Sequence, residues 1–184
     1  MLPFYIQEDD PPAKREILRA AMRLFSRNGL AATSIRDIAK ASGYTNPALY
    51  KHFESKEELA LYLFEACHRR LWTACQAAIE GTSSFDTKLE RYIGQVLALV
   101  DEDPEAMAFL SDSARVLWPL AGSSVRRHTM IGLARSLMGN DVAAASLQGT
   151  LAELARMIHV GAVAGPAVRW KRDLVTLFRK VAAK

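Results

Sequence analysis

The chain has 184 residues, enough for one large domain or two small ones, and its 50% hydrophobic and 24% charged residues exclude a disordered protein. The net charge of +4 permits a nucleic-acid partner without requiring one. The longest run without a charged residue, Met157 to Val168, has twelve residues, whereas a transmembrane helix needs about 20. Residues 1–10 lack the basic start and the apolar run of a secretory signal, so we expect a cytoplasmic protein.

Apolar residues recur at intervals of three and four along most of the chain, which predicts an all-α fold. Residues 1–12 form an acidic arm that ends in two prolines, and we expect this arm to be flexible. The helices that we predict cover residues 13–28, 35–41, 45–53, 56–80, 85–101, 104–118, 123–138, 141–164 and 166–183. Cys67 and Cys75 lie on one of them, about 12 Å apart along its axis, too far to form a disulfide.

Local signals mark the helices between residues 34 and 58. Ser34 with Asp37, and Ser55 with Glu58, have the spacing of N-terminal capping boxes. Pro47 is acceptable in the first turn of a helix capped by Thr45, because its missing N–H has no partner there. Two short helices joined by residues 42–45 are a helix-turn-helix, covering about residues 34–53.

The positive charge is concentrated on the same part of the chain. Residues 13–56 hold nine basic and three acidic residues, whereas residues 1–12 carry a net charge of −3 and residues 57–184 only +1. Binding to DNA phosphates requires such a cationic surface, so this distribution supports a DNA-binding unit at residues 13–64.

Several motifs of this unit resemble those of the TetR family of transcriptional regulators. They are Lys14-Arg15-Glu16-Ile17-Leu18, Thr33-Ser34-Ile35-Arg36-Asp37-Ile38-Ala39, Ala48-Leu49-Tyr50-Lys51-His52-Phe53 and Ser55-Lys56-Glu57-Glu58-Leu59. The resemblance covers about residues 13–64, a third of the chain, and departs from the usual pattern at Pro47, where Gly or another small residue is typical. It implies an amino-terminal DNA-binding domain, followed at residues 65–184 by a helical domain that dimerises and often binds a small effector.

Side-chain reach and the resemblance together suggest which residues contact DNA. Asn46 can read an adenine or bind a phosphate, and Tyr50 can bind a phosphate or pack in the domain core, where we also expect Leu49 and Phe53. Lys56 adds a cation beside helix N-terminal amides, where phosphates bind well. The predicted DNA-binding residues are Ser34, Arg36, Thr45, Asn46, Pro47, Ala48, Tyr50, Lys51, His52 and Lys56.

The carboxy-terminal two-thirds carry weaker signals. Aromatic, sulfur and histidine side chains could line an effector pocket, although residues at this spacing are more often plain core. The candidates are Phe64, His68, Trp72, Met107, Leu110, Trp118, His128 and Met130. An apolar stripe on the last two predicted helices indicates a dimer interface or the core of the monomer, with Gly161 and Gly165 allowing close helix approach. The interface candidates are Leu147, Leu151, Leu154, Ile158, Gly161, Gly165, Trp170, Leu174 and Phe178.

No pattern of catalytic, metal-binding or cofactor-binding residues is complete. Glu65 and His68 have the spacing of one arm of a di-iron site, but the other ligands of such a site are missing. We therefore expect no enzyme, no metal and no cofactor. The sequence predicts a homodimeric DNA-binding regulator, a repressor that a small lipophilic or aromatic effector releases from an inverted-repeat operator. The alternative is a DNA-binding regulator without small-molecule control.

Overall fold

The computed structural model describes residues 3–182, and all regular secondary structure in that range is helical, as predicted. The α-helices are α1 (Pro12–Asn28), α2 (Ile35–Ser42), α3 (Asn46–Tyr50), α4 (Lys56–Ile79), α5 (Phe85–Glu102), α6 (Pro104–Leu117), α7 (Ser123–Arg127), α8 (Met130–Met138), α9 (Asp141–His159) and α10 (Lys171–Ala182). Two short 3-10 helices, η1 (Trp118–Leu120) and η2 (Ala167–Trp170), precede α7 and α10. Within the described range, no helix has the length and apolar character to cross a membrane.

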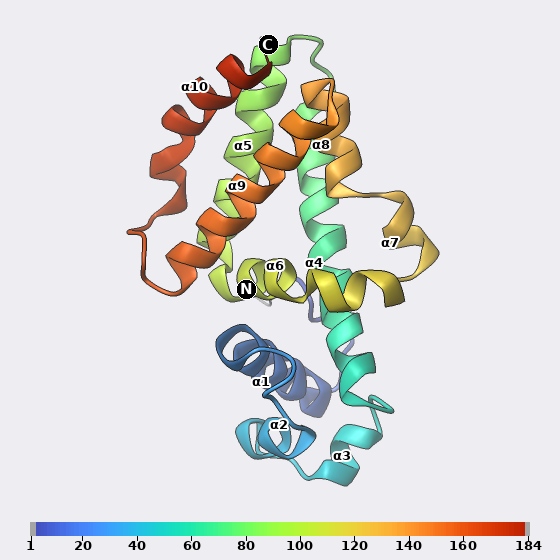
Figure 1. Ribbon diagram of the computed structural model, residues 1–184. Helices are drawn as coiled ribbons and strands as arrows, with labels where there is room; N and C mark the ends of the chain where they lie inside the picture. Colours follow the sequence, from blue (N-terminus) through green and yellow to red (C-terminus); the bar gives the residue numbers. More distant parts are fainter. Residues whose placement is uncertain (1–2, 183–184) are drawn as a thin grey trace.

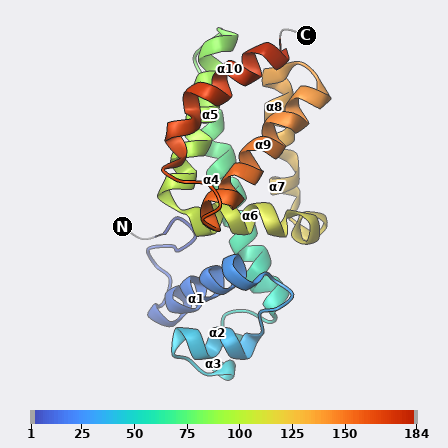
Figure 2. The same cartoon turned by 60° about the vertical axis from the view of Figure 1, so that its left-hand side comes forward.

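The helices form two lobes that share α4. Helices α1 to α3 make a small lobe at one end of the molecule, and α5, α8, α9 and α10 form a bundle around the upper part of α4 (Figure 1). Helix α6 lies across the boundary between the lobes, as the second view also shows (Figure 2). Leu59, Leu63, Cys67, Leu71 and Cys75 recur every four residues on α4 and are all buried, so one apolar stripe anchors this helix in both lobes.

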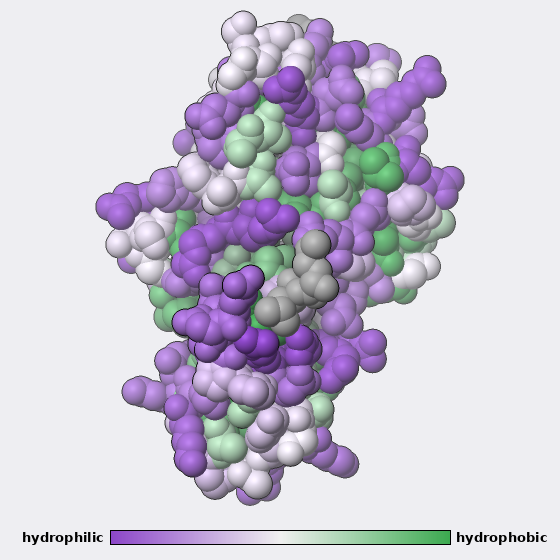
Figure 3. Space-filling view, turned by 180° about the vertical axis from the view of Figure 1, so that it is seen from behind, coloured by the Kyte–Doolittle hydropathy of each residue, from purple (hydrophilic) through white to green (hydrophobic). Residues whose placement is uncertain are grey.

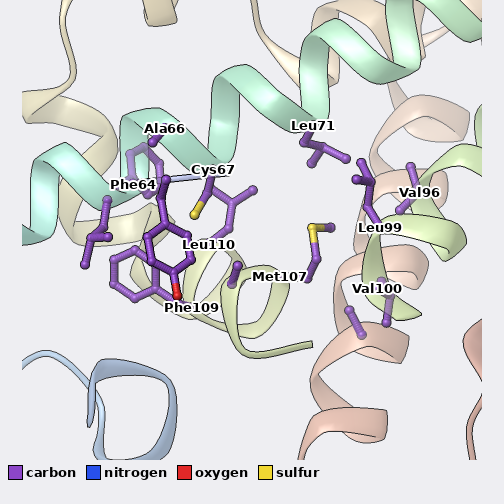
Figure 4. Close-up of a cluster of buried hydrophobic side chains, with 14 of the residues drawn as sticks. Phe64, Ala66, Cys67, Leu71, Val96, Leu99, Val100, Met107, Phe109 and Leu110 are labelled. Atoms are coloured by element: carbon purple, nitrogen blue, oxygen red, sulfur yellow. The ribbon is translucent and has the colours of Figure 1, made fainter. Parts of the chain in front are cut away.

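The lobes meet where α1 packs against α6. The rings of Phe25 and Phe109 stack with a centroid distance of 5.8 Å and an interplanar angle of 20°, and both residues are buried. At the edge of this contact, Arg27 forms an ion pair of 3.6 Å with Glu105. Figure 4 shows Phe109 and Leu110 of α6 beside Phe64 and Cys67 of α4, so α6 packs against the long helix as well. Apolar burial therefore joins the lobes.

The amino-terminal arm differs from the flexible segment that we expected. Within its described part, residues 3–10, Tyr5 and Ile6 are buried in the core of the molecule, and Asp10 is buried as well. The Asp10 carboxylate forms an ion pair of 2.7 Å with Lys14 and accepts a hydrogen bond of 2.8 Å from the backbone N–H of Gln7. The prediction was wrong because two apolar side chains in a short acidic segment are enough to bind it to the core.

Two predicted helix boundaries were also wrong. The expected helix at 123–138 is divided at His128 and Thr129, where the Thr129 hydroxyl accepts a hydrogen bond from the Gly132 N–H and starts α8. The expected helix at 141–164 ends at His159, and Gly161 then adopts a positive φ of 74° in the loop that follows. Gly161 and Gly165 therefore lie in the loop between α9 and α10, where they cannot form a helix-packing motif.

We expect the contact between the lobes to contribute strongly to stability. Replacing Phe109 with alanine should lower the free energy of unfolding by about 3–5 kcal/mol, because it removes a fully buried ring and leaves a cavity. The same replacement at Val116, which lies on α6 but is 56% exposed, should change it by no more than about 0.5 kcal/mol. Urea unfolding of the two variants measures both values, and equal effects would contradict this account of the contact.

Burial of His68 should make the stability depend on pH. Burial, with smaller effects of Arg69 and His128, lowers the pKa of His68 from 6.5 to about 4. As the pH falls from 6.5 towards 4, the unfolded chain binds a proton that the folded chain does not, so the free energy of unfolding should fall. In His68→Phe the fall should be smaller, because no titrating ring is left at the buried position. Urea unfolding at a series of pH values tests this, and an unchanged pH dependence in His68→Phe would refute it.

Candidate nucleic-acid interface and ligand cavity

Capping interactions and a turn set the geometry of α2 and α3. The Ser34 hydroxyl accepts a hydrogen bond from the Asp37 N–H at 3.2 Å, and the Asp37 carboxylate accepts one from the Ser34 N–H at 2.9 Å, so the predicted capping box is confirmed. The hydrogen bonds from Ser34 lower the pKa of the Asp37 carboxyl. Gly43 ends α2 in the left-handed conformation, with a φ of 78°, and lets the chain turn towards α3.

The start of α4 differs slightly from the predicted capping box. The Ser55 hydroxyl accepts a hydrogen bond from the Glu58 N–H at 3.0 Å, as expected. The Glu58 carboxylate, however, accepts from the N–H of Glu54, the residue before the cap, and not from that of Ser55. Both interactions still hold the chain between α3 and α4, so they fix how α3 is presented.

Apolar residues hold α3 in place and leave its polar residues accessible. Leu49 and Phe53 are buried, as predicted, whereas Tyr50 is 53% exposed, which excludes the alternative that it packs in the domain core. Of the predicted DNA-binding residues, Ser34, Arg36, Thr45, Pro47, Tyr50 and Lys51 are exposed, and Asn46, Ala48, His52 and Lys56 are half-buried. The structure thus places them in one segment of the small lobe, on α2, α3 and the start of α4.

The cations of the small lobe fall into two groups. Arg36 and Lys51 are exposed and have no ion-pair partner among residues 3–182, so their charge is available to a ligand. On α1, Lys14 pairs with Asp10, Arg19 with Glu16 and Arg27 with Glu105. Arg23 of α1 and Lys40 of α2 are also exposed without an ion-pair partner among the described residues, so available positive charge lies on α1 as well as on α2 and at the end of α3.

Lys56 has a structural contact that the sequence does not reveal. Its ammonium group donates hydrogen bonds to the carbonyl oxygens of Leu30 and Thr33, at 2.9 and 3.0 Å. Two of its three donors thus hold the loop between α1 and α2 against the start of α4. A change at Lys56 will affect the fold of the small lobe as well as any contact that it makes with DNA.

The second lobe contains a cavity of about 350 Å³, at the lower end of the range for small-molecule sites. Six of the eight predicted pocket residues line it: Phe64, His68, Met107, Leu110, Trp118 and Met130. Figure 4 shows Phe64, Met107 and Leu110 near one another between α4 and α6. Trp72 and His128 are not among the lining residues and pack against each other, with a centroid distance of 4.3 Å.

The rest of the cavity wall was missed from the sequence. Val96 of α5 and Gln148, Gly149 and Leu151 of α9 also line it, with Leu71, Ser111, Ala114, Thr129, Ile131 and Ala152. The spacing of the apolar residues on α9 was a usable signal, but it indicates a buried face without saying which helices cover that face.

Four of the nine predicted interface residues are buried in the core of the single chain. Leu147, Leu151, Leu174 and Phe178 are buried within the chain and present almost no surface to a partner, so they are corrected to core residues. Leu154, Ile158 and Trp170 are half-buried and pack at the edge of the core.

The Glu65 carboxylate, considered above as a metal ligand, accepts a hydrogen bond of 2.6 Å from the Gly122 N–H and so ties α4 to the loop before α7.

Comparison with known proteins identifies the small lobe. Residues 17–63 match the family model of bacterial regulatory proteins of the tetR family. The chain is 39% identical to the HTH-type transcriptional regulator AcrR of Shigella flexneri over 59 residues, which are 32% of this chain and 27% of AcrR. It is 29% identical to the HTH-type transcriptional repressor KstR2 of Rhodococcus jostii over 104 residues, 56% of this chain and 51% of KstR2. The aligned part thus spans about half or less of these relatives.

Solved structures extend the likeness in fold to the second lobe. The ketosteroid transcriptional regulator KstR2 of Mycobacterium tuberculosis superposes with a TM-score of 0.80 at 18% identity, covering 97% of this chain and 96% of that one. A TetR-like transcriptional regulator from Rhodococcus sp. RHA1 gives a TM-score of 0.73 at 23% identity, over 94% and 97% of the two chains. Residues 17–63 are therefore similar to bacterial regulatory proteins of the tetR family, and more than nine-tenths of the chain has the fold of solved TetR-like regulators.

Proposed function

We propose that this protein is a sequence-specific DNA-binding transcriptional regulator, a repressor that a small apolar effector releases from an inverted-repeat operator. The observation that carries the proposal is the arrangement of α2 and α3 within the region that matches the family. Buried Leu49 and Phe53 hold α3 in place, while Thr45, Pro47 and Lys51 are exposed on its first turn and at its end. The similarity to AcrR, a transcriptional regulator, and to KstR2, a transcriptional repressor, supports the same function.

The residues of α3 divide by the contacts that they can make with DNA. Thr45, Asn46, Pro47 and Ala48 lie at its start, where a recognition helix meets base edges in the major groove. Tyr50 and the residues after it are suited to phosphates, which fix the position of the protein on the duplex. Asn46 is half-buried and can still bind an adenine or a phosphate.

A homodimer is part of the proposal, because an inverted repeat requires a two-fold axis. With four of the nine predicted interface residues assigned to the core, and Gly161 and Gly165 lying in the loop after α9, the remaining candidates are Leu154, Ile158 and Trp170. To these we add Leu177, which is 48% exposed on α10. On the face seen in Figure 3, hydrophobic residues reach the surface in separate patches among hydrophilic ones.

Helix α6 gives the cavity a direct mechanical route to the DNA-binding lobe. Met107 and Leu110 of α6 line the cavity, and Phe109, between them in sequence, stacks on Phe25 of α1. Helix α4 forms a second route, since it begins beside α3 and contributes Phe64 and His68 to the cavity wall. An effector that favours a different position of either helix would change the orientation of α3 and hence the affinity for the operator.

Two experiments test this function. The sites that the protein binds are first mapped across the genome, and binding to each mapped sequence is then measured by gel shift. We expect the protein to bind an inverted repeat at nanomolar protein concentrations, and we expect the complex to dissociate when an effector is added. The compounds to test are substrates and products of the enzymes encoded beside the bound sites. If none of them releases the DNA complex, the result would favour the alternative, a regulator without small-molecule control. Failure to bind any of the mapped sequences at low salt would refute the proposal.

A comparison of variants at Lys51 and Lys56 distinguishes an effect on DNA binding from an effect on the stability of the fold. In Lys51→Ala we expect weaker binding to all sequences and a salt dependence, the slope of log affinity against log salt, reduced by about one, with an unchanged melting temperature. In Lys56→Ala we expect the same reduction in slope together with a lower melting temperature, because the carbonyls of Leu30 and Thr33 lose their donor. A change of base preference in either variant would show that the lysine reads sequence instead.

A further inference from the structure

The cavity of the second lobe is apolar except at four residues. These are His68, Ser111, Thr129 and Gln148, and no Asp, Glu, Lys or Arg lines it. An ionised group placed inside would lose its hydration without gaining a counter-charge. The lining therefore selects against a charged ligand group and leaves these four side chains, together with the indole N–H of Trp118, as hydrogen-bonding partners for a ligand.

Gln148 presents an acceptor to the cavity. Its amide Nε2 donates hydrogen bonds to the hydroxyl of Tyr92 and to the carbonyl oxygen of Met130, the latter at 3.1 Å. Both donors of the amide are thus used within the protein, and no described residue donates to its Oε1. By contrast, the Ser111 hydroxyl donates to the Met107 carbonyl and can only accept from a ligand, while the Thr129 hydroxyl accepts from the Gly132 N–H and keeps its own proton to donate.

His68 is the polar side chain of the cavity that lacks a partner. It is 5% exposed, and its Nδ1 is buried without a hydrogen-bond partner among the described residues. Its ring lies against Trp118, with a centroid distance of 5.3 Å, and against Phe64 at 6.3 Å. The nearest charged groups, Arg69 and Glu65, lie on the same helix and pair with each other at 3.8 Å. Nδ1 has almost no accessible surface, so a ligand reaches it only if the ring turns. Because a buried polar group without a partner costs free energy, a ligand that favours this turn and pairs with the ring would gain affinity.

We infer that the cavity takes an uncharged, largely apolar molecule that carries a hydroxyl group, and that His68 and Gln148 form the polar end of the site. The inference rests on the proposed effector role of the cavity and specifies the chemical class of the effector. A hydroxyl group both donates and accepts, so it can pair with the Gln148 Oε1 and with the His68 ring in either of its neutral tautomers. A pure hydrocarbon leaves His68 unpaired, and a carboxylate is excluded by the uncharged lining.

Four biphenyl probes of matched shape test the inference by direct binding to the full chain, without DNA. They are para-phenylphenol, para-methoxybiphenyl, biphenyl and biphenyl-para-carboxylate, with affinities measured by calorimetry at pH 7. We expect the phenol to bind about tenfold more tightly than biphenyl and the methoxy compound, because it alone supplies a hydrogen-bond donor, and at least about tenfold more tightly than the carboxylate.

Two histidine variants form the matched control. In His68→Phe the preference for the phenol over biphenyl should fall from about tenfold to about threefold, because the Gln148 acceptor is still present, whereas His128→Phe, at a histidine that does not line the cavity, should keep the wild-type ratio. Equal binding of phenol and biphenyl, tighter binding of the carboxylate, or no binding of any probe to the wild type would each overturn the inference. Because the probes are measured without DNA, these results are independent of whether the protein binds an operator, so failure of the inference is distinguishable from failure of the proposed function.

Discussion

The burial of α6 between the two lobes is the constraint on which the rest of the structure depends. Along one turn, Met107 and Leu110 line the cavity, while Phe109 is enclosed against Phe25 of α1. Protein interiors are close-packed, so a side chain on one side of this helix cannot move far without moving those on the other. The cavity and the small lobe therefore share one packed element, and a ligand that favours one position of α6 also favours one position of the lobe.

Polar interactions in the small lobe position residues more than they stabilise it. The Ser34–Asp37 box is exposed and worth little by itself, because its hydrogen bonds compete with water, whereas the partly buried hydrogen bonds of the Lys56 ammonium group contribute more. Their effect is to fix where α2 begins and how the loop before it meets α4. Leu49 and Phe53 supply the apolar burial, and the side chains that they leave outside are those suited to DNA. Packing and recognition are thus divided between the two faces of one short helix.

The small lobe was predicted well because its structure depends on local sequence signals. The large lobe was predicted only in part because its structure depends on contacts between residues distant in the sequence. The caps at Ser34 and Ser55 act within four residues, so the sequence places them directly, whereas Thr45 precedes α3 as predicted but its side chain makes no capping hydrogen bond. The apolar residues of α9 and α10 indicate a buried face just as clearly, yet Leu147 and Phe178 pack inside their own chain and not against a partner. The prediction of a flexible amino-terminal arm was wrong for the same reason, because Tyr5 and Ile6 pack against residues that are distant in the sequence.

The sequence by itself determined the all-α fold, the helix-turn-helix with its cationic surface, and six residues of the cavity. These depend on helical periodicity, local capping and residue type, which are properties of short segments. Only the tertiary structure decided that α6 joins the lobes, that Gln148 lies in the cavity wall with an acceptor free, and that His68 is buried there without a partner. Those properties depend on which helices meet, and that is set by the packing of segments distant in sequence.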